Sequence, residues 1–254
     1  MLATQRRQHL IQRLEQQGAL SSAEVAQELG VSVLTIRRDL ERLEQQGLVR
    51  RTHGGAHAPG VSELAYTQRA GRDPGAKRLI GEHAAGLVED GETIFLDAGT
   101  TTLEIARALR RRPLRSLRVV THAVNIAAEL VNHPPFKVFS IGGEIFEETY
   151  ASTGQVAVET ISRYTYDRFF LACMGFDPRG GITNARVPEV EVKAAALEHA
   201  RWTCLVADAS KWGVHTFARV APLGSVQGLI TDERLPEAGR AELARLGVNV
   251  WIAK

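Results

Sequence analysis

Residues 32–56 read SVLTIRRDLERLEQQGLVRRTHGGA, and they predict a helix followed by a short basic hairpin. Ser32 has the chemistry of an N-cap, and Gly47 that of a helix end. Leu48–Arg51 is typical of a short strand, and residues 53–55 of a turn. Apolar residues recur in the helix at helical spacing and predict one buried stripe, which consists of Val33, Ile36, Leu40 and Leu43.

The residues before this helix predict two further helices. The first has an apolar face of Leu10, Ile11 and Leu14 and should end at Gly18. Ser21 and Glu24 fit a capping box at the start of the second, which spans about residues 23–29 and should bury Val25, Ala26 and Leu29. Residues 30–32 then form a tight turn, which is the spacing of a helix-turn-helix.

A basic helix that leads into a basic hairpin predicts a DNA-binding surface. We expect Arg38 and Thr35 to contact base edges, since arginine pairs well with guanine. The side chains expected to hold phosphates are Ser22, Ser32, Arg37, Arg50, Arg51 and His53. The alternative is a small three-helix domain that binds protein, with Arg37 and Arg38 on a solvated face; the ordered set of cap, turn, helix and hairpin favours DNA.

This segment closely resembles the winged helix-turn-helix of the DeoR family of bacterial transcriptional regulators. The resemblance rests on VSVLTIRRDL at 31–40, LE at 43–44, GLVRR at 47–51 and HGGA at 53–56. It implies a sequence-specific regulator and not an enzyme: a repressor of a carbohydrate-metabolism operon that binds double-stranded operator DNA. A homo-oligomer is expected because palindromic operators need two heads, and the sequence leaves dimer and tetramer open.

Length and composition are those of an ordinary globular protein. The 254 residues suffice for one small and one medium domain, and the net charge of +2 favours a localised DNA contact over a generally basic surface. Cys173 and Cys204 lie in apolar runs, which predicts buried thiols in a reducing compartment. Because no signal pattern and no apolar run of about 20 residues is found, we expect a cytoplasmic protein without membrane contact.

The chain divides into three parts by pattern. We expect a winged helix-turn-helix over 1–57, a turn-rich linker over 58–75 and an effector-binding domain over 76–254. In the third part strand and helix patterns alternate, which predicts an α/β fold: a Rossmann-like, mostly parallel sheet covered on both faces. The expected strands are 93–98, 117–121, 137–141, 168–174, 203–208, 226–231 and 248–252, and the expected helices 77–88, 102–109, 123–131, 156–162, 188–199 and 237–246.

The sequence DAGTTT at 97–102 directly follows a predicted strand and opens a helix. Gly99 allows close backbone approach, and the free amides and threonine hydroxyls at the helix start could cradle an anion. The lysine of a Walker A loop is missing, which disfavours a nucleoside triphosphate. The alternative is that the threonines only cap the helix.

Other polar or glycine-rich residues follow the predicted strands at 121–122, 141–143, 174–183 and 208–213, and a further group lies in the predicted helix at 189–193. In parallel sheets, ligands bind beyond the carboxyl ends of the strands, so these residues are expected to converge. Glu189 and Lys193 are four apart and should share one helix face, either as part of a ligand site or as a surface pair. Lys211 lies just after a strand, where a cation could meet a phosphate.

Residues 77–254 are similar to the DeoR-family effector domain, whose fold is related to ribose-5-phosphate isomerase and to the glucosamine-phosphate deaminase and CoA-transferase group. The resemblance implies a phosphorylated sugar or related metabolite as effector. His122 stands where many relatives have asparagine, so the effector cannot be copied from a relative. The implied effector residues are Asp97, Gly99, Thr100, Thr101, Thr102, His122, Gly142, Gly143, Asp177, Gly181, Glu189, Lys193 and Lys211, with phosphate held by Thr100–Thr102 and Lys211.

We predict no cofactor, no catalytic residue and no metal site. The eight histidines are scattered, and only His53 and His57 have ligand spacing, in a hairpin better explained by DNA contact. The competing hypothesis is a sugar-phosphate isomerase or deaminase with Glu189 as base, but a shared fold does not establish a reaction. An architectural DNA binder would leave the second domain without a purpose.

Overall fold

The computed structural model describes residues 3–17, 19–46, 48–51, 54–57 and 66–254. The chain separates into two compact units, residues 1–69 and 70–254. Each unit has a hydrophobic core of its own, so each is described by itself.

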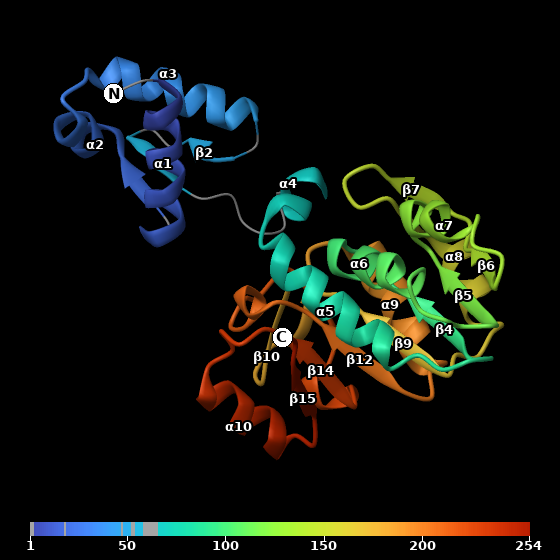
Figure 1. The fold of residues 1–254 in the computed structure, drawn as a ribbon. Helices are drawn as coiled ribbons and strands as arrows, with labels where there is room; N and C mark the ends of the chain where they lie inside the picture. Colours follow the sequence, from blue (N-terminus) through green and yellow to red (C-terminus); the bar gives the residue numbers. More distant parts are fainter. Residues whose placement is uncertain (1–2, 18, 47, 52–53, 58–65) are drawn as a thin grey trace. The chain divides into compact units, whose positions relative to one another are not determined.

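The N-terminal unit is a three-helix domain with a small antiparallel sheet (Figure 1). Its core is formed by Leu10, Val25, Ile36, Leu40 and Leu43, all below 2 % exposed. The strands lie in the order β1-β3-β2. The elements are α1 (Ala3–Gln17), β1 (Ala19–Ser21), α2 (Ser22–Leu29), α3 (Val33–Gln45), β2 (Arg50–Arg51) and β3 (Gly55–His57).

The predicted helix-turn-helix is confirmed. Gly30 ends α2 in the left-handed conformation, at φ 63°, and its amide donates to the carbonyls of Ala26 and Gln27. The hydroxyl of Ser32 accepts from the amide of Thr35 at 3.1 Å and caps α3 as predicted. The strand β1 was not predicted; it pairs with β3, so the hairpin becomes a three-stranded sheet.

Two local predictions were wrong. Val33 is 38 % exposed because the first residue of α3 projects beyond the core that Ile36, Leu40 and Leu43 fill. Ser21 precedes α2, but within the described part of the chain its side chain makes no capping hydrogen bond, so the capping box is not formed. The predicted helix ends at Gly18 and Gly47 lie outside the described residues.

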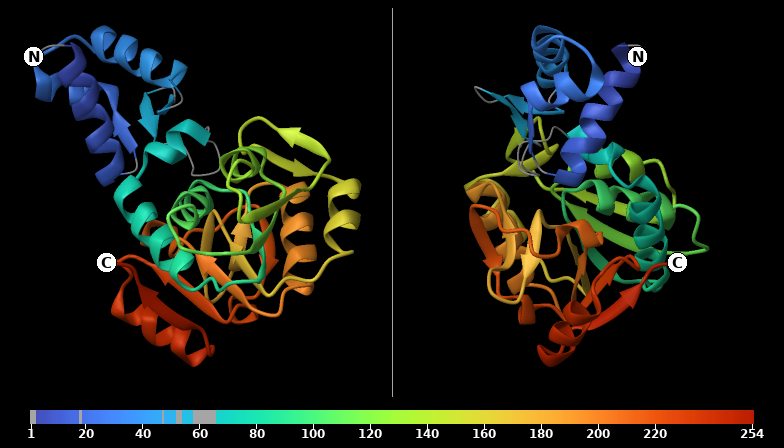
Figure 2. Two further views of the ribbon diagram at one scale, coloured as in Figure 1. Left: turned by 45° about the vertical axis from the view of Figure 1, so that its right-hand side comes forward. Right: turned by 90° about the vertical axis from the view of Figure 1, so that its left-hand side faces the viewer.

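The C-terminal unit is built on a seven-stranded parallel sheet in the order β15-β14-β12-β9-β4-β5-β6 (Figures 1 and 2). From β4 in the interior, the chain builds outward through β5 to β6 and then returns to place β9 on the other side of β4. The strand order therefore reverses between β4 and β9. The strands are β4 (Thr93–Leu96), β5 (Leu117–Thr121), β6 (Phe136–Ser140), β9 (Arg168–Leu171), β12 (Thr203–Val206), β14 (Gly228–Thr231) and β15 (Asn249–Ile252).

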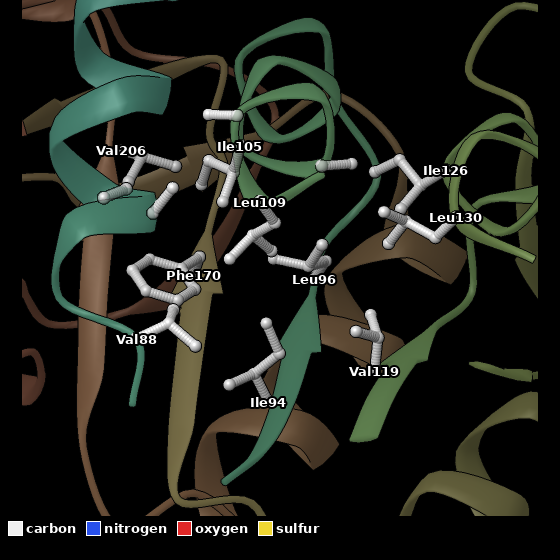
Figure 3. Close-up of a cluster of buried hydrophobic side chains, with 14 of the residues drawn as sticks. Val88, Ile94, Leu96, Ile105, Leu109, Val119, Ile126, Leu130, Phe170 and Val206 are labelled. Carbon is white, nitrogen blue, oxygen red and sulfur yellow. The ribbon is translucent and has the colours of Figure 1, made fainter. Parts of the chain in front are cut away.

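Helices cover both faces of the sheet. On one face, side chains of α5, α6 and α7 pack with Ile94 and Leu96 of β4 (Figure 3). On the other face, α8, α9 and α10 pack with Phe95 and its neighbours. The helices are α5 (Pro74–Gly86), α6 (Thr100–Leu109), α7 (Val124–Leu130), α8 (Gln155–Ile161), α9 (Val187–Glu198) and α10 (Glu237–Arg245).

Short elements surround this frame. A helix, α4 (Tyr66–Gly71), lies within the predicted linker. None of the helices in the described ranges is both long and apolar enough to span a membrane. Smaller elements are the hairpin β7 (Glu144–Phe146) and β8 (Ala151–Thr153), the sheet β10 (Gly175–Asp177), β11 (Gly181–Asn184) and β13 (Ala218–Ala221), and the 3₁₀ helices η2 (Ala209–Lys211) and η3 (Leu223–Ser225).

Candidate functional site

The reversal of strand order between β4 and β9 places the candidate ligand site, because open α/β sheets bind ligands at the carboxyl ends of such strands. Asp97 directly follows β4 and is completely buried. Its Oδ2 accepts from the amide of Ala172, the first residue after β9, at 2.9 Å. The Asp97 carboxylate thus bridges the two strands at the switch point.

Lys193 and His122 converge on Asp97. Lys193 of α9 donates from Nζ to Oδ2 of Asp97, and also to the carbonyl of Ala172 at 3.2 Å. Nε2 of His122, which follows β5, lies 2.9 Å from Oδ1 of Asp97. All three side chains are at most 2 % exposed. The Asp97 carboxylate therefore fixes the side chains of two other elements.

Both ring nitrogens of His122 have hydrogen-bond partners. Nδ1 lies 2.9 Å from the carbonyl of Ser152, which can only accept, so Nδ1 carries a proton. Nε2 lies 2.9 Å from Oδ1 of Asp97 and 3.1 Å from the amide of Ala98, which also donates to Oδ1 of Asp97. Burial raises the pKa of Asp97, but the charge of Lys193 and the interaction with His122 outweigh it, so the pKa lies below its ordinary value.

These positions differ in part from the sequence-based expectation. Asp97, His122 and Thr102 are completely buried, and the Thr102 hydroxyl donates to the carbonyl of Gly99. They are therefore placed to support a ligand site and offer a ligand no surface. Thr101 is also buried, whereas Thr100 is partly exposed.

Glu189 and Lys193 both lie on the inner side of α9, so the alternative of a surface pair is wrong. Lys193 pairs with Asp97, while Oε2 of Glu189 accepts from the side-chain amide of Asn184 at 2.7 Å. Oε1 of Glu189 is buried and has no hydrogen-bond partner among the described residues. A buried side-chain oxygen without a partner is suited to receive a donor from a ligand.

The end of β9 carries a thiol that the sequence did not single out for this site. Burial raises the pKa of Cys173 to about 12, while the charges of Lys211 and Lys193 act in the opposite direction. Both lysines are therefore close to the end of β9. Lys211 ends η2 and is partly buried. Asp208, directly before η2, caps this short helix, because its carboxylate accepts from the amide of Ser210 at 3.1 Å.

The remaining predicted effector residues lie at strand ends. Asp177 ends β10 and pairs with Gly181, which begins β11. Oδ1 of Asp177 accepts from the amides of Arg179 and Gly180, and its other oxygen pairs with His215. Gly181, at φ 77°, lies where a Cβ would come within 2.3 Å of the Ala221 carbonyl. Gly142 and Gly143 are exposed after β6. The geometry gives a structural reason for Asp177, Gly181 and Gly143, but none for Gly142.

The N-terminal unit presents the predicted basic side chains in part. Arg37 and Arg38 of α3 are exposed, and so is Arg51, whose amide donates to Oε1 of Glu44 at 2.9 Å. Thr35 is half-buried, and its hydroxyl lies 2.8 Å from that of Ser32. The side chain of Arg50 and the whole of His53 lie outside the described residues.

Ser22 is the one predicted phosphate contact that the structure disfavours. The residue is only 3 % exposed, and its backbone amide donates to the carbonyl of Gly54. Ser22 therefore serves to join α2 to the sheet rather than to face a phosphate.

A buried ion pair that the sequence analysis missed joins α3, the recognition helix of the helix-turn-helix, to α1. Asp39 of α3 accepts from Nε of Arg6 on α1, and both residues are at most 9 % exposed. The sequence carried a signal for this pair, because Asp39 is an acidic residue that is flanked by core positions of the helix.

Comparison with known proteins finds a family model for each of two parts of the chain. Residues 6–60 match the model of the DeoR-like helix-turn-helix domain, and residues 72–233 that of the DeoR C terminal sensor domain. The chain is 34 % identical over 256 residues to YgbI of Escherichia coli, named as an HTH-type transcriptional regulator, with 100 % of this chain and 99 % of the relative covered. It is 32 % identical to the glycerol-3-phosphate regulon repressor of the same organism, with 93 % of each chain covered.

Among solved structures, ribose 5-phosphate isomerase A from Methanocaldococcus jannaschii shares 16 % identity. The match covers 54 % of this chain and 53 % of the isomerase, with a TM-score of 0.38. A likeness of this degree carries no argument about function.

Proposed function

This chain belongs to the DeoR family of transcriptional regulators, and from that premise we propose that it represses a carbohydrate-metabolism operon until a phosphorylated sugar releases it from DNA. The observation that carries the proposal is the presence in one chain of a helix-turn-helix with an exposed arginine pair and a sensor domain with a buried lysine–aspartate pair at its switch point. The glycerol-3-phosphate regulon repressor is a relative over nearly the full length, which supports a phosphorylated small molecule as effector.

The proposed DNA contact is made by α3 and the sheet that follows it. Arg38 and Thr35 read base edges, while Ser32, Arg37 and Arg51 hold phosphates, together with Arg50 and His53. The exposure of Arg37, Arg38 and Arg51 supports this assignment. Two DNA-binding domains bind one palindromic operator, so the protein acts as a homo-oligomer in the cytoplasm.

The proposed effector site lies outside the carboxyl ends of β4, β9 and β12. Phosphate is held by Thr100, the first amides of α6 and Lys211, because helix amides at an N-terminus have no intrahelical acceptor. The free oxygen of Glu189 accepts from a sugar hydroxyl. Asp97, His122 and Lys193 contribute through position: the buried pair of Lys193 with Asp97 and the contact of His122 with the same carboxylate hold the strand ends that carry the site.

The same geometry speaks against an enzyme of the isomerase or deaminase type. Lys193, the cation that was expected beside Glu189, is bonded to Asp97 and to a backbone carbonyl. Relatives over nearly the full length of the chain are named as transcriptional regulators, which favours a regulator over an enzyme. We therefore propose binding without turnover.

The test is a thermal-shift screen of the full-length protein against a panel of sugar phosphates, with the unphosphorylated sugars as controls. A ligand of the native state raises the melting temperature by mass action. We expect a selective rise with one phosphate, loss of that rise in Lys211→Met, and its retention in Lys137→Met, which changes an exposed lysine of β6. The active compound should release the protein from DNA, and no turnover of it should be detected. No shift with any phosphate contradicts the effector proposal.

A further inference from the structure

The first turn of α3 exposes two large apolar side chains. Leu34 is 57 % exposed and Val33 is 38 % exposed, whereas Ile36 and Leu40 of the same helix are at most 1 % exposed. The helix start is fixed by the Ser32 cap, so this turn cannot rotate to bury Leu34 without breaking that bond.

Leu34 shares the outward face of α3 with Arg38. At about 100° per residue, positions four apart lie one above the other, and Leu34 and Arg38 both point away from the side of Ile36 and Leu40. Arg37, Arg38 and Arg42 are all exposed. Leu34 is therefore set in a basic helix surface, which favours a polyanion as its occupant over a neutral protein surface.

The major groove offers one apolar group to such a helix, the 5-methyl of thymine. Helix-turn-helix proteins place the N-terminal residues of the second helix against base edges. A leucine in that position has no hydrogen-bonding group, so it can distinguish bases only by contact with a methyl group.

We propose that Leu34 reads thymine methyl groups in the operator; this rests on the DNA-binding function proposed above. The rise between Leu34 and Arg38 is about 6 Å, which corresponds to roughly two base-pair steps. The thymine that Leu34 contacts should thus lie within about two base pairs of the base contacted by Arg38.

The test uses an operator selected from a random double-stranded DNA library with the full-length protein. Each thymine of the selected site is then replaced singly by deoxyuridine, which removes only the 5-methyl. We expect one or two positions at which the replacement weakens binding about fourfold, the equivalent of one buried methyl group. At those positions Leu34→Ala should bind thymine and uracil equally, with unchanged affinity for random DNA.

The matched control is Leu246→Ala, which removes a 40 % exposed leucine of the C-terminal unit and should keep the thymine preference. If the selection enriches a site but uracil is tolerated everywhere, or if Leu34→Ala keeps the preference, the methyl reading is overturned while DNA binding stands. A change in oligomeric state of Leu34→Ala with an intact thymine preference assigns Leu34 to a contact between copies and also overturns it. Failure to enrich any site removes the DNA-binding proposal and this inference together.

Discussion

Nε of Arg6 on α1 donates to Oδ2 of Asp39 on α3 at 2.5 Å, and both side chains are buried. This pair ties the recognition helix to the first helix of the domain. The neighbours of Asp39 have opposite roles, because Arg38 is exposed and Leu40 lies in the core. The ion pair therefore sets which side of α3 faces outward.

Asp39→Asn should lower the stability of the N-terminal unit by about 3 kcal/mol, because it leaves the Arg6 charge buried without its partner. All three tryptophans lie at or after Trp202, so tryptophan fluorescence reports only on the C-terminal unit. Hydrogen exchange of α1 and α3 should speed up while the fluorescence transition stays unchanged. Glu41→Gln, at an exposed acid of the same helix, is the control and should leave exchange as it is. Unchanged exchange in Asp39→Asn contradicts a structural role of the pair.

Adjacent glycines after β6 give a second prediction. Gly143 has φ 142°, and a Cβ there would come within 2.4 Å of the Thr153 carbonyl, whereas a Cβ on Gly142 meets no described atom within 4 Å. Gly143→Ala should therefore cost about 1–3 kcal/mol of stability. Urea unfolding followed by tryptophan fluorescence measures it, with Gly142→Ala as the control that stays near wild type. Equal loss in both variants would show that the Thr153 contact is not the cause.

The five interior strands of the parallel sheet could be predicted from sequence because strands buried on both faces are continuous apolar runs. The edge strands β6 and β15 are partly exposed, and they were predicted from their place in the alternation with helices. The predicted strand 117–121 matches β5, and the expected alternation of helices is confirmed. The three-residue strands β1, β7, β8 and β10 were not predicted, since so short a segment carries no periodic pattern.

The candidate site was predictable to the level of strand ends, but not of partners. Spacing along α9 favoured Glu189 as the partner of Lys193, whereas the observed partner, Asp97, is 96 residues away in sequence. Val33 shows a related limit: its position continues the apolar stripe, yet it lies past the edge of the core. Periodicity indicates the direction in which a side chain points, but it does not indicate how far along the helix the core extends.

The prediction of two buried thiols holds for Cys204 alone, because Cys173 is partly exposed. Both thiols should nevertheless react slowly in the native protein. Burial raises the pKa of Cys173 to about 12, and it raises the pKa of the completely buried Cys204 as well. Since the thiolate is the nucleophile, alkylation by iodoacetamide at pH 8 should be at least about a hundredfold slower than for a free cysteine. Mass spectrometry of the time course measures this, and urea-unfolded protein, which should label at two sites, is the control. Rapid labelling of native Cys173 would show that its thiolate forms more readily than this raised pKa allows.

Lys193→Met should destabilise the C-terminal unit by about 3 kcal/mol at neutral pH, because it removes a partner of a buried carboxylate. Burial raises the pKa of Asp97, but Lys193 and His122 hold it below its ordinary value of 3.8. A carboxyl whose pKa is lower in the folded state stabilises the fold above its unfolded pKa, and this contribution is lost as the pH falls through the folded pKa. The stability difference between wild type and Lys193→Met should therefore be largest at pH 7 and shrink below about pH 4.

Urea unfolding followed by tryptophan fluorescence from pH 3 to pH 7 measures this difference. Lys137→Met, at an exposed lysine of β6, makes the same chemical change and should leave stability and its pH dependence near those of wild type. A Lys193→Met deficit that is equal at pH 3 and pH 7 would mean that the lysine stabilises by packing alone. If the loss of stability in Lys193→Met disappears in acid, and Lys137→Met keeps the stability of wild type, the Asp97 carboxylate is the group through which Lys193 acts.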